Sequence, residues 1–347
     1  MLKISLSTAS DMCPAMTLPI MPLEFHLEAV DHLSLPPYKG STMRGGLGWA
    51  LKPFFCTSPY LTCVSCPQAF TCGYPWLFET RHPNPGPDGR RRPAPEPLPS
   101  RVPRPAASPP GHSHPRPFVL LPPLSQETEF SPGSRLILGL TLIGRAIDYL
   151  PFFLLAVEHM ARAGLGRGWS RGRGRVRLLE ARSPAPEAAP LYDGATRLIQ
   201  EPLPVQHWSP DPDPKAQDRD LTLTFLTPAR LVNRKQLVRQ LSFAVLIRNL
   251  LRRLHHLAAF APQGIDLDYS GLARAAEEVA TGAQDLTWHA WQRYSHRQDR
   301  PVDMDGLVGS VQYLAVPPLF HPLLELGQWV HVGKGTSSGL GKYIVQG

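Results

Sequence analysis

The 347-residue sequence lacks the features that mark exported and membrane proteins. Its longest apolar run, Tyr149 to Val157, is far shorter than the roughly 20 residues that a spanning helix needs. The N-terminal residues show no basic stretch followed by an apolar core, so they do not read as a secretory signal. We therefore expect a soluble, cytoplasmic protein without a membrane partner.

The sequence also lacks the common nucleotide-binding loops, although it has a glycine-rich stretch, Val330 to Tyr343 (VHVGKGTSSGLGKY). Thr336 stands where a P-loop requires its first glycine, and Ser338 stands where a dinucleotide fingerprint requires its third. Too few residues follow for the helix and strand of a dinucleotide-binding unit. The spacing argues against a nucleotide or other small-molecule substrate and leaves the phosphate of a nucleic acid as the candidate ligand.

The composition favours a polyanionic partner. The formal net charge is +8, and arginine supplies most of the positive charge. Of the 40 prolines, 21 lie in two stretches, residues 82–117 and 183–215, and the first of these also contains Arg90, Arg91 and Arg92. Such composition is typical of extended or disordered chain, so we expect an insertion and a linker there.

Four of the five cysteines lie in one segment, Cys56 to Cys72, which we call the cysteine knuckle. Their spacing includes one CxxC pair, Cys63 and Cys66, and four thiols so close in sequence suit tetrahedral metal binding. Without a secretory signal, disulfides are the weaker interpretation. A structural zinc ion is the leading interpretation, an iron–sulfur cluster or free thiols are the alternatives, and four sulfur ligands would leave no open position for catalysis.

The apolar periodicity predicts an α+β protein built from two tandem ferredoxin-like (βαββαβ) domains, each ending in a glycine-rich loop. The expected boundaries are residues 1–182 for the first domain, 183–215 for the linker and 216–347 for the second domain. The glycine-rich loops are expected at residues 164–174 and 333–341. The cysteine knuckle and the insertion 82–117 belong to the first domain.

Individual elements follow from local patterns. In the first half we expect strands over Leu23–Val30, Arg135–Ile143 and Arg175–Glu180, and helices from Ser41 or Thr42 to about Phe55 and from about Pro151 to Ala163. In the second half we expect strands over Leu221–Leu226, Leu286–Tyr294, Gly306–Ala315 and Gln328–Val332, and helices over Asn233–Phe260, Tyr269–Val279 and Pro318–Gly327.

Several strings resemble a known family. LTFLTPARLV (223–232), WQRYSHRQ (291–298), GLVGSVQY (306–313) and WVHVGKGTSSGLGKY (329–343) resemble the C-terminal domain of the endoribonuclease that processes CRISPR repeat RNA, a member of the repeat-associated RNA-binding superfamily. YKGSTMRGGLGWAL (38–51) and the cysteine knuckle resemble a branch of the same family.

The resemblance implies antiviral RNA processing. Such an enzyme cuts precursor CRISPR RNA within each repeat without a catalytic metal, by attack of a 2′-hydroxyl on the adjacent phosphorus, and leaves a 2′,3′-cyclic phosphate and a 5′-hydroxyl. This chemistry needs a base, an acid and cations at the phosphorane. The implied partners are repeat RNA, the mature CRISPR RNA and subunits of a CRISPR effector complex.

The candidate catalytic residues are His32 after the first strand, His331 before the glycine-rich loop, Lys334 within it, and Tyr38. We expect His331 to lie on a strand, opposite Val330 and Val332, so that it faces the open sheet surface or the groove between the domains. The candidate RNA-binding residues are Lys39, Arg44, Arg167, Arg171, Arg173, Arg175, Arg293, Tyr294, Arg297, Gly333, Gly335, Gly339, Gly341 and Lys342.

A second hypothesis has the same fold and basic surface but no catalytic activity. In this hypothesis the chain is a non-catalytic RNA-binding subunit of a CRISPR effector complex. The two hypotheses differ in whether substitution of His32 or His331 affects cleavage, because only an enzyme needs a proton-transferring group.

Overall fold

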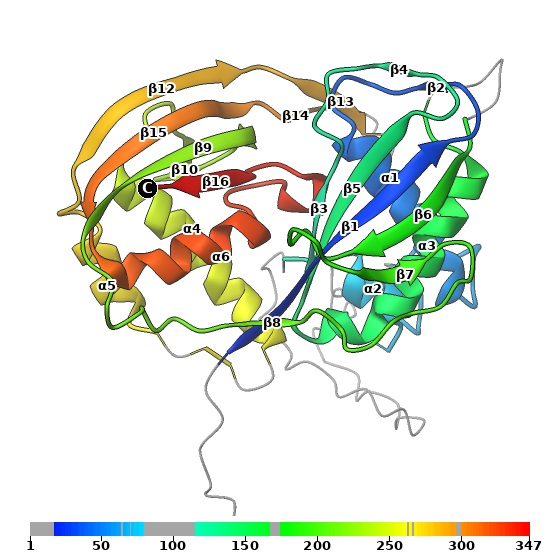
Figure 1. Cartoon of the computed structure of the whole chain (residues 1–347), viewed down its shortest axis with the longest axis horizontal. Coiled ribbons are helices and arrows are strands. Elements are labelled where there is room, and N and C mark those ends of the chain that lie inside the picture. The colour runs from blue at the N-terminus through cyan, green and yellow to red at the C-terminus, as the bar shows by residue number, and fades with distance from the viewer. Residues whose placement is uncertain are drawn as a thin grey trace, which may run out of the picture.

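The structure is a computed structural model, and it describes residues 17–63, 65–69, 71–79, 115–166, 174–261, 264–265, 267–295 and 300–347. Figure 1 shows two sheets side by side, each with its helices on one face. The N-terminal half forms one sheet and the C-terminal half the other, as the sequence predicts. Among the described residues, no helix is both long and apolar enough to cross a bilayer.

The first sheet has the strand order of a ferredoxin-like domain. Its strands are β1 (Leu18–Ala29), β3 (Phe118–Leu121), β5 (Arg135–Ile143) and β6 (Val176–Arg182), in the spatial order β3-β5-β1-β6. All neighbours are antiparallel. Its helices are α1 (Gly40–Leu51), α2 (Gly73–Leu77) and α3 (Leu150–Ala163), and short strands β2 (Leu33–Ser34) and β4 (Glu129–Phe130) pair beside it.

The alternation predicted for the first strand is confirmed. Leu23, Phe25, Leu27 and Ala29 are buried in the core that α1 and α3 cover. The strand starts earlier than predicted, and its first residues, Leu18 and Ile20, pack in the core of the second domain. Strand β1 therefore contributes side chains to the cores of both domains.

Residues 183–215, predicted as a linker, contain two short strands. Strand β7 (Pro190–Asp193) extends the sheet beyond β6, and β8 (Gln206–Trp208) pairs with the start of β1. Trp208 donates a hydrogen bond from Nε1 to the Pro322 carbonyl of the second domain, at 2.8 Å. The predicted domain boundaries themselves stay a prediction.

The second sheet repeats the same order. Its strands are β9 (Arg219–Ala229), β12 (Thr281–His289), β15 (Gly306–Val316) and β16 (Tyr343–Gln346), arranged β12-β15-β9-β16. Its helices are α4 (Phe243–Leu257), α5 (Tyr269–Ala275) and α6 (His321–Val330), and Figure 1 shows α4 and α6 on the same side of the sheet. The hairpins β10 (Val232–Asn233) with β11 (Gln236–Leu237), and β13 (Gln292–Ser295) with β14 (Arg300–Asp303), project from it.

Two predicted elements of the second half are wrong. The helix predicted from Asn233 begins only at Phe243, because the β10–β11 hairpin occupies the intervening chain. The strand predicted at Gln328–Val332 does not form, since α6 continues to Val330. A short apolar run reads equally well as a strand or a buried helix end, and here the packing of Val330 in the core decided for the helix.

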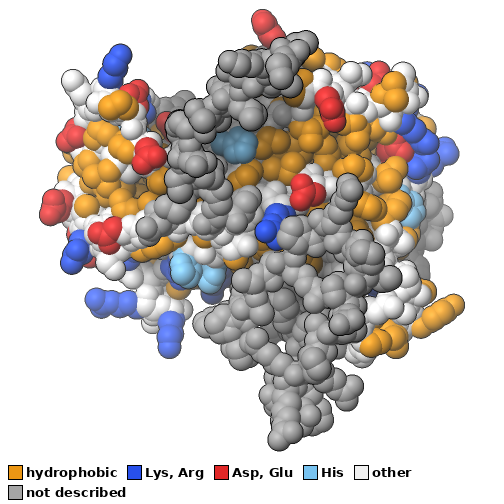
Figure 2. Space-filling model, turned by 90° about the horizontal axis from the view of Figure 1, so that it is seen from below, with side chains coloured by type: hydrophobic (Ala, Val, Ile, Leu, Met, Phe, Trp, Pro, Cys, Tyr) orange, Lys and Arg blue, Asp and Glu red, His pale blue; other side chains and the backbone are white. Residues whose placement is uncertain are grey.

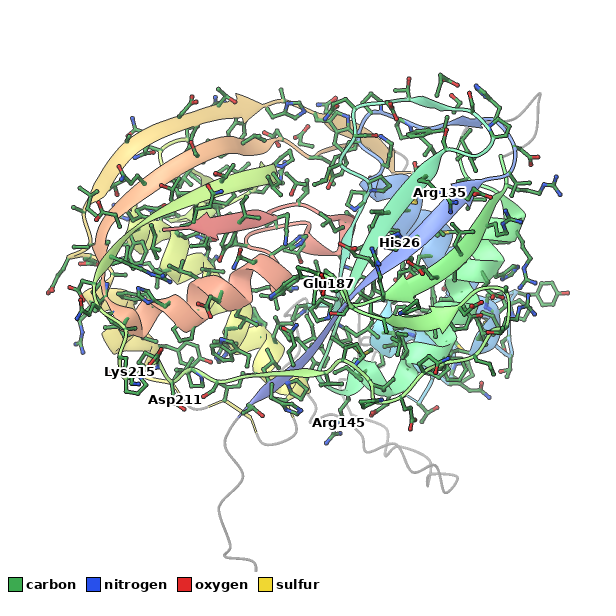
Figure 3. The ribbon with its side chains drawn as sticks, viewed as in Figure 1. His26, Arg135, Arg145, Glu187, Asp211 and Lys215 are labelled. Atoms are coloured by element: carbon green, nitrogen blue, oxygen red, sulfur yellow. The ribbon has the colours of Figure 1, made fainter. Side chains whose placement is uncertain are left out.

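The open face of the first sheet carries charges of both signs. Figure 3 labels His26 on β1 and Arg135 at the start of β5, both on the face away from the helices. Glu28 pairs with Arg135 and with Arg177, and His26 lies 3.6 Å from Glu24.

On the described part of the face shown in Figure 2, apolar side chains reach the surface in the middle, and charges of both signs are scattered around them.

Two glycines of α1 give a matched test of how tightly this helix packs. A Cβ at Gly48 would lie 2.3 Å from the Phe78 ring, whereas a Cβ at Gly45 would meet nothing within 4 Å. We expect Gly48→Ala to lower the free energy of unfolding by about 1–3 kcal/mol, because the core is overpacked. Gly45→Ala should raise it by up to about 1 kcal/mol through helix propensity. Equal effects of the two substitutions in urea unfolding would contradict this packing.

Candidate functional site

One segment of the first domain lies against both glycine-rich loops. This β1–α1 segment, residues 30–39, connects β1 to α1. A Cβ at Gly166 or Gly174 of the first loop would lie 2.2 Å from the Ser34 carbonyl oxygen and 2.5 Å from that of His32. The opposite end of the segment lies against the second loop. The same segment therefore contacts two glycine-rich loops that are far apart in the sequence, one at each of its ends.

His32 lies at the first end of this segment and is exposed. Its Nε2 is 3.5 Å from Glu129 Oε2, so a carboxylate can orient the imidazole. Beside it, Asp31 accepts two side-chain hydrogen bonds from Arg175, at 2.7 and 3.1 Å. This Arg175 guanidinium lowers the pKa of the Asp31 carboxyl, and the pairing means that Arg175, a predicted RNA-binding residue, already has an anionic partner.

Tyr38 fastens the other end of the segment to the second loop. Its hydroxyl donates a hydrogen bond to the Ser338 carbonyl, at 2.8 Å. A Cβ at Gly40 would lie 2.0 Å from the same carbonyl oxygen, so only glycine permits this approach. Burial raises the pKa of Tyr38. A buried hydroxyl engaged as a donor suits the positioning of the loop better than the proton transfer predicted for it.

The predicted RNA-reading string 291–298 begins at the same place. The Trp291 ring packs edge-on against Tyr38, with 4.7 Å between ring centroids. The β13–β14 hairpin follows directly, and it carries Arg293 and Tyr294, whose side chains lie outside the described residues, as does Arg297. The hairpin, the β1–α1 segment and the second glycine-rich loop thus meet around Tyr38.

The conformation of the second glycine-rich loop depends on its backbone angles and backbone hydrogen bonds. Gly333, Gly335, Gly339 and Gly341 all have positive φ, between 74° and 92°, which other residues rarely adopt. The amides of Gly339 and Gly341 donate to Thr336 and Pro228 carbonyls, so they serve the fold. Among the described residues, the amides of Gly335, Thr336 and Ser337 donate to no backbone carbonyl in the loop, but Thr336 and Ser337 are buried, so the amide of the exposed Gly335 is the one placed to meet a phosphate.

The sequence reasoning missed Arg116, which connects this loop to the first domain. Its Nε donates to the Phe78 carbonyl at 2.7 Å, and its Nη1 donates to Ser337 Oγ at 3.2 Å. Arg116 lies at the edge of the proline-rich insertion, where charge runs gave no specific signal. Only the tertiary contact with Ser337 identifies it.

His331 is not where the sequence predicts. It ends α6 with a φ of 56°, it is 2% exposed, and its Nδ1 bonds to the Leu340 carbonyl at 3.2 Å. Burial lowers its pKa well below the usual value, and the nearby Lys342 lowers it further. The predicted placement on an open strand face is therefore wrong, because the residue faces the interior and closes the loop.

Two predicted RNA-binding lysines are also buried. Lys39 is fully buried and donates to the Pro37 and Ser125 carbonyls, at 3.2 and 2.7 Å. Lys342 donates to the Gln328 carbonyl at 2.8 Å and lies 4.8 Å from the Trp329 ring. Burial lowers its pKa to about 8. The structure gives both lysines internal acceptors in place of phosphates.

The remaining predicted residues divide into exposed, packed and undescribed ones. Lys334 is exposed at the edge of the second loop, where a phosphate could reach it. The Arg44 side chain of α1 packs on the Phe78 ring, with its guanidinium carbon 4.8 Å from the ring centroid. Arg167, Arg171 and Arg173 of the first loop lie outside the described residues.

Two family models match the chain. One, described as an N-terminal domain, matches residues 18–203, and the other, the CRISPR-associated endoribonuclease Cas6, matches residues 223–343. The chain therefore belongs to the family of this N-terminal domain over residues 18–203, and its residues 223–343 match the Cas6 family. The first match covers more than half of the chain and contains the β1–α1 segment, and the Cas6 domain ends on the second glycine-rich loop. The family predicted from the sequence strings is confirmed.

Similar proteins share the fold across most of the chain. Cas6 of Thermus thermophilus has a TM-score of 0.51 at 16% identity, and the alignment covers 96% of this chain and 100% of that one. A Cas6 product complex gives a TM-score of 0.50 at 17% identity, over 94% and 99% of the two chains. A partial Cas6-RT-Cas1–Cas2 complex gives 0.54 at 13% identity, over 96% of this chain and 46% of that one.

A relative by sequence is an uncharacterised protein of Archaeoglobus fulgidus. It is 24% identical over 195 residues, which make up 56% of this chain and 56% of that protein. The match thus spans little more than half the length of this relative.

The placement of His331 predicts a pH effect on stability. Its pKa is lowered in the folded state, so the unfolded chain binds the proton more readily as the pH falls below about 6.5. Stability contributed by neutral His331 is therefore present above that pH and lost below it. We expect thermal unfolding of the wild type to shift to lower temperature on acidification, and His331→Asn to reduce this shift, since an amide can replace the Nδ1 donor without titrating.

His32→Asn is the matched control for this measurement, because His32 is exposed. It should leave the acid slope of the unfolding temperature unchanged. An acid slope that His331→Asn does not alter would contradict the internal placement of His331.

Proposed function

We propose that this chain is a cytoplasmic endoribonuclease that processes precursor CRISPR RNA in antiviral defence, by cutting within each repeat. The observation that carries the proposal is the exposed His32, which pairs with Glu129 of β4 and lies on the segment that both glycine-rich loops touch. The match of residues 223–343 to Cas6 and the similarity in fold to a Cas6 product complex support repeat RNA as the partner.

The chemistry assigned to this site is transesterification without a metal. The His32 imidazole takes the proton of the 2′-hydroxyl, and the resulting oxygen attacks the adjacent phosphorus in line. The 5′-oxygen leaves and takes up a proton, so the products are a 2′,3′-cyclic phosphate and a 5′-hydroxyl. Histidine is suited to such transfers near neutral pH, and Glu129 would hold its ring in position.

The phosphate is assigned to the second glycine-rich loop. Lys334 supplies an exposed positive charge, and the amide of the exposed Gly335 supplies a donor for a phosphorane oxygen. Tyr38 and Arg116 hold this loop against the first domain through Ser338 and Ser337. The cation and the proton acceptor therefore come from two different domains, and these two hydrogen bonds help to hold the domains together.

A non-catalytic RNA-binding subunit of a CRISPR effector complex is the second candidate. The observation in its favour is that two of the four predicted catalytic side chains, Tyr38 and His331, are engaged in internal hydrogen bonds. On this hypothesis the site binds RNA phosphate and performs no proton transfer.

The deciding experiment incubates the full chain with repeat RNA of its own genome in EDTA and analyses the RNA ends. We expect one cut per repeat with a cyclic phosphate, and no cut when the nucleotide at the cut carries a 2′-deoxy sugar. His32→Ala should slow single-turnover cleavage by roughly 10²- to 10⁴-fold, the usual contribution of a general base.

His331→Asn is the matched control, and it should leave the cleavage rate unchanged because that side chain is buried. RNA binding without any cut would favour the non-catalytic subunit. Cleavage that His32→Ala does not slow would overturn the role given to His32.

A further inference from the structure

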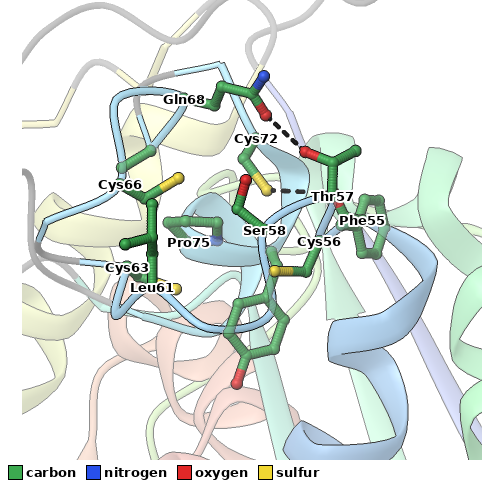
Figure 4. A pocket seen from close by; sticks show the side chains of 12 residues that line it. Phe55, Cys56, Thr57, Ser58, Leu61, Cys63, Cys66, Gln68, Cys72 and Pro75 are labelled. Carbon is green, nitrogen blue, oxygen red and sulfur yellow. Dashed lines mark hydrogen bonds between the residues drawn. The ribbon is translucent and has the colours of Figure 1, made fainter.

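The structure gathers the four cysteines of the knuckle around one cavity. Cys56, Cys63, Cys66 and Cys72 all line it, and its volume is about 20 Å³, enough for a single small ion or water molecule. Figure 4 shows the four side chains around this space, with the Cys72 thiol donating a hydrogen bond to the Phe55 carbonyl at 3.7 Å. Sequence spacing alone did not require all four cysteines to line the same cavity.

The knuckle has no apolar core that could hold it together. Within the described residues of 56–72, Ala69 alone is buried, and the segment contains neither a helix nor a strand. Its backbone bonds are local turns, such as Ser65 N to the Thr62 carbonyl and Ala69 N to the Cys66 carbonyl. Small segments without a core commonly depend on a disulfide or a metal ion.

The knuckle is joined at both ends to the core. Phe55, just before Cys56, packs 4.8 Å from the Phe152 ring, and α2 begins directly after Cys72. Trp76 of α2 packs 5.9 Å from Phe260 of the second domain. The residue that follows α2, Phe78, accepts the Arg116 hydrogen bond. A cross-link in the knuckle would therefore fix the start of α2 and, beyond it, the side chain that reaches the second glycine-rich loop.

We propose that Cys56, Cys63, Cys66 and Cys72 bind one zinc ion, which fixes the knuckle and the start of α2. The four thiols release four protons as they bind, and no electron is transferred. With four sulfur ligands the site is closed, so it is structural and takes no part in cleavage.

The side chains must turn slightly to reach this geometry. Among the described residues, no three cysteine, histidine or acidic side chains already converge closely enough to hold an ion. The four thiols are only partly buried. Cys63 and Cys72 lie against the core of the first domain, and zinc binding would replace the hydrogen bond from the Cys72 thiol to the Phe55 carbonyl. The zinc ion itself would draw the sulfur atoms to the roughly 2.3 Å that zinc–thiolate bonds require.

The test begins with the metal content of the full chain, purified without chelator from cells grown with zinc and iron. We expect one zinc ion per chain by elemental analysis and no iron. The double variant Cys63→Ser/Cys66→Ser should contain almost no zinc, whereas Cys13→Ser should keep it, because Cys13 lies outside the knuckle.

A second measurement does not depend on a variant that folds poorly. In Cys13→Ser, a mercurial thiol reagent should release the zinc as it titrates four thiols. Replacement of zinc by Co²⁺ should give the absorption of a tetrahedral tetrathiolate. Iron with sulfide, a metal-free protein as purified, or zinc that Cys63→Ser/Cys66→Ser retains would each overturn the proposal. Metal content is read without RNA, so its outcome is independent of whether the chain cuts repeats.

Discussion

The contact between the β1–α1 segment and the second glycine-rich loop is the interaction on which the site depends. The Tyr38 hydroxyl bonds to the Ser338 carbonyl, and Gly40 and Gly339 leave the space that this approach needs. Each domain alone would carry half of the proposed site. Because a Cβ at Gly40 or Gly339 would meet neighbouring atoms, the contact tolerates no larger side chain at these two positions.

Several polar residues near the loop serve this packing and not a ligand. His331 closes the end of α6 against Leu340, and Lys342 caps the last turn of the same helix through the Gln328 carbonyl. Arg253 is fully buried, donates to the Val330 carbonyl, and has its pKa lowered to about 10 by that burial. Lys342 and Arg253 thus satisfy carbonyls at the end of α6 and His331 satisfies a carbonyl of the loop, and these carbonyls would otherwise be left without partners inside the protein.

The charges that remain for RNA are consequently fewer than the composition suggests. On the first sheet Glu28 is shared by two arginines, and Asp31 is paired with Arg175. Lys334 is the predicted lysine that stays exposed at the described part of the loop. Binding would therefore rest on a few well-placed groups such as Lys334 and the Gly335 amide, and less on a broad basic surface.

The sequence by itself determined the two βαββαβ domains, the buried face of β1, the extent of β5 and the family. Those features depend on local periodicity and on strings whose residues are close together in the chain. Only the tertiary structure decided which side chains could reach a ligand. Burial of Lys39 and His331, the end of α6 at Val330 and the contact of Arg116 with Ser337 all depend on residues distant in the sequence. A pattern of residue types cannot report such distances, because the same histidine or lysine suits a helix end and a phosphate equally well.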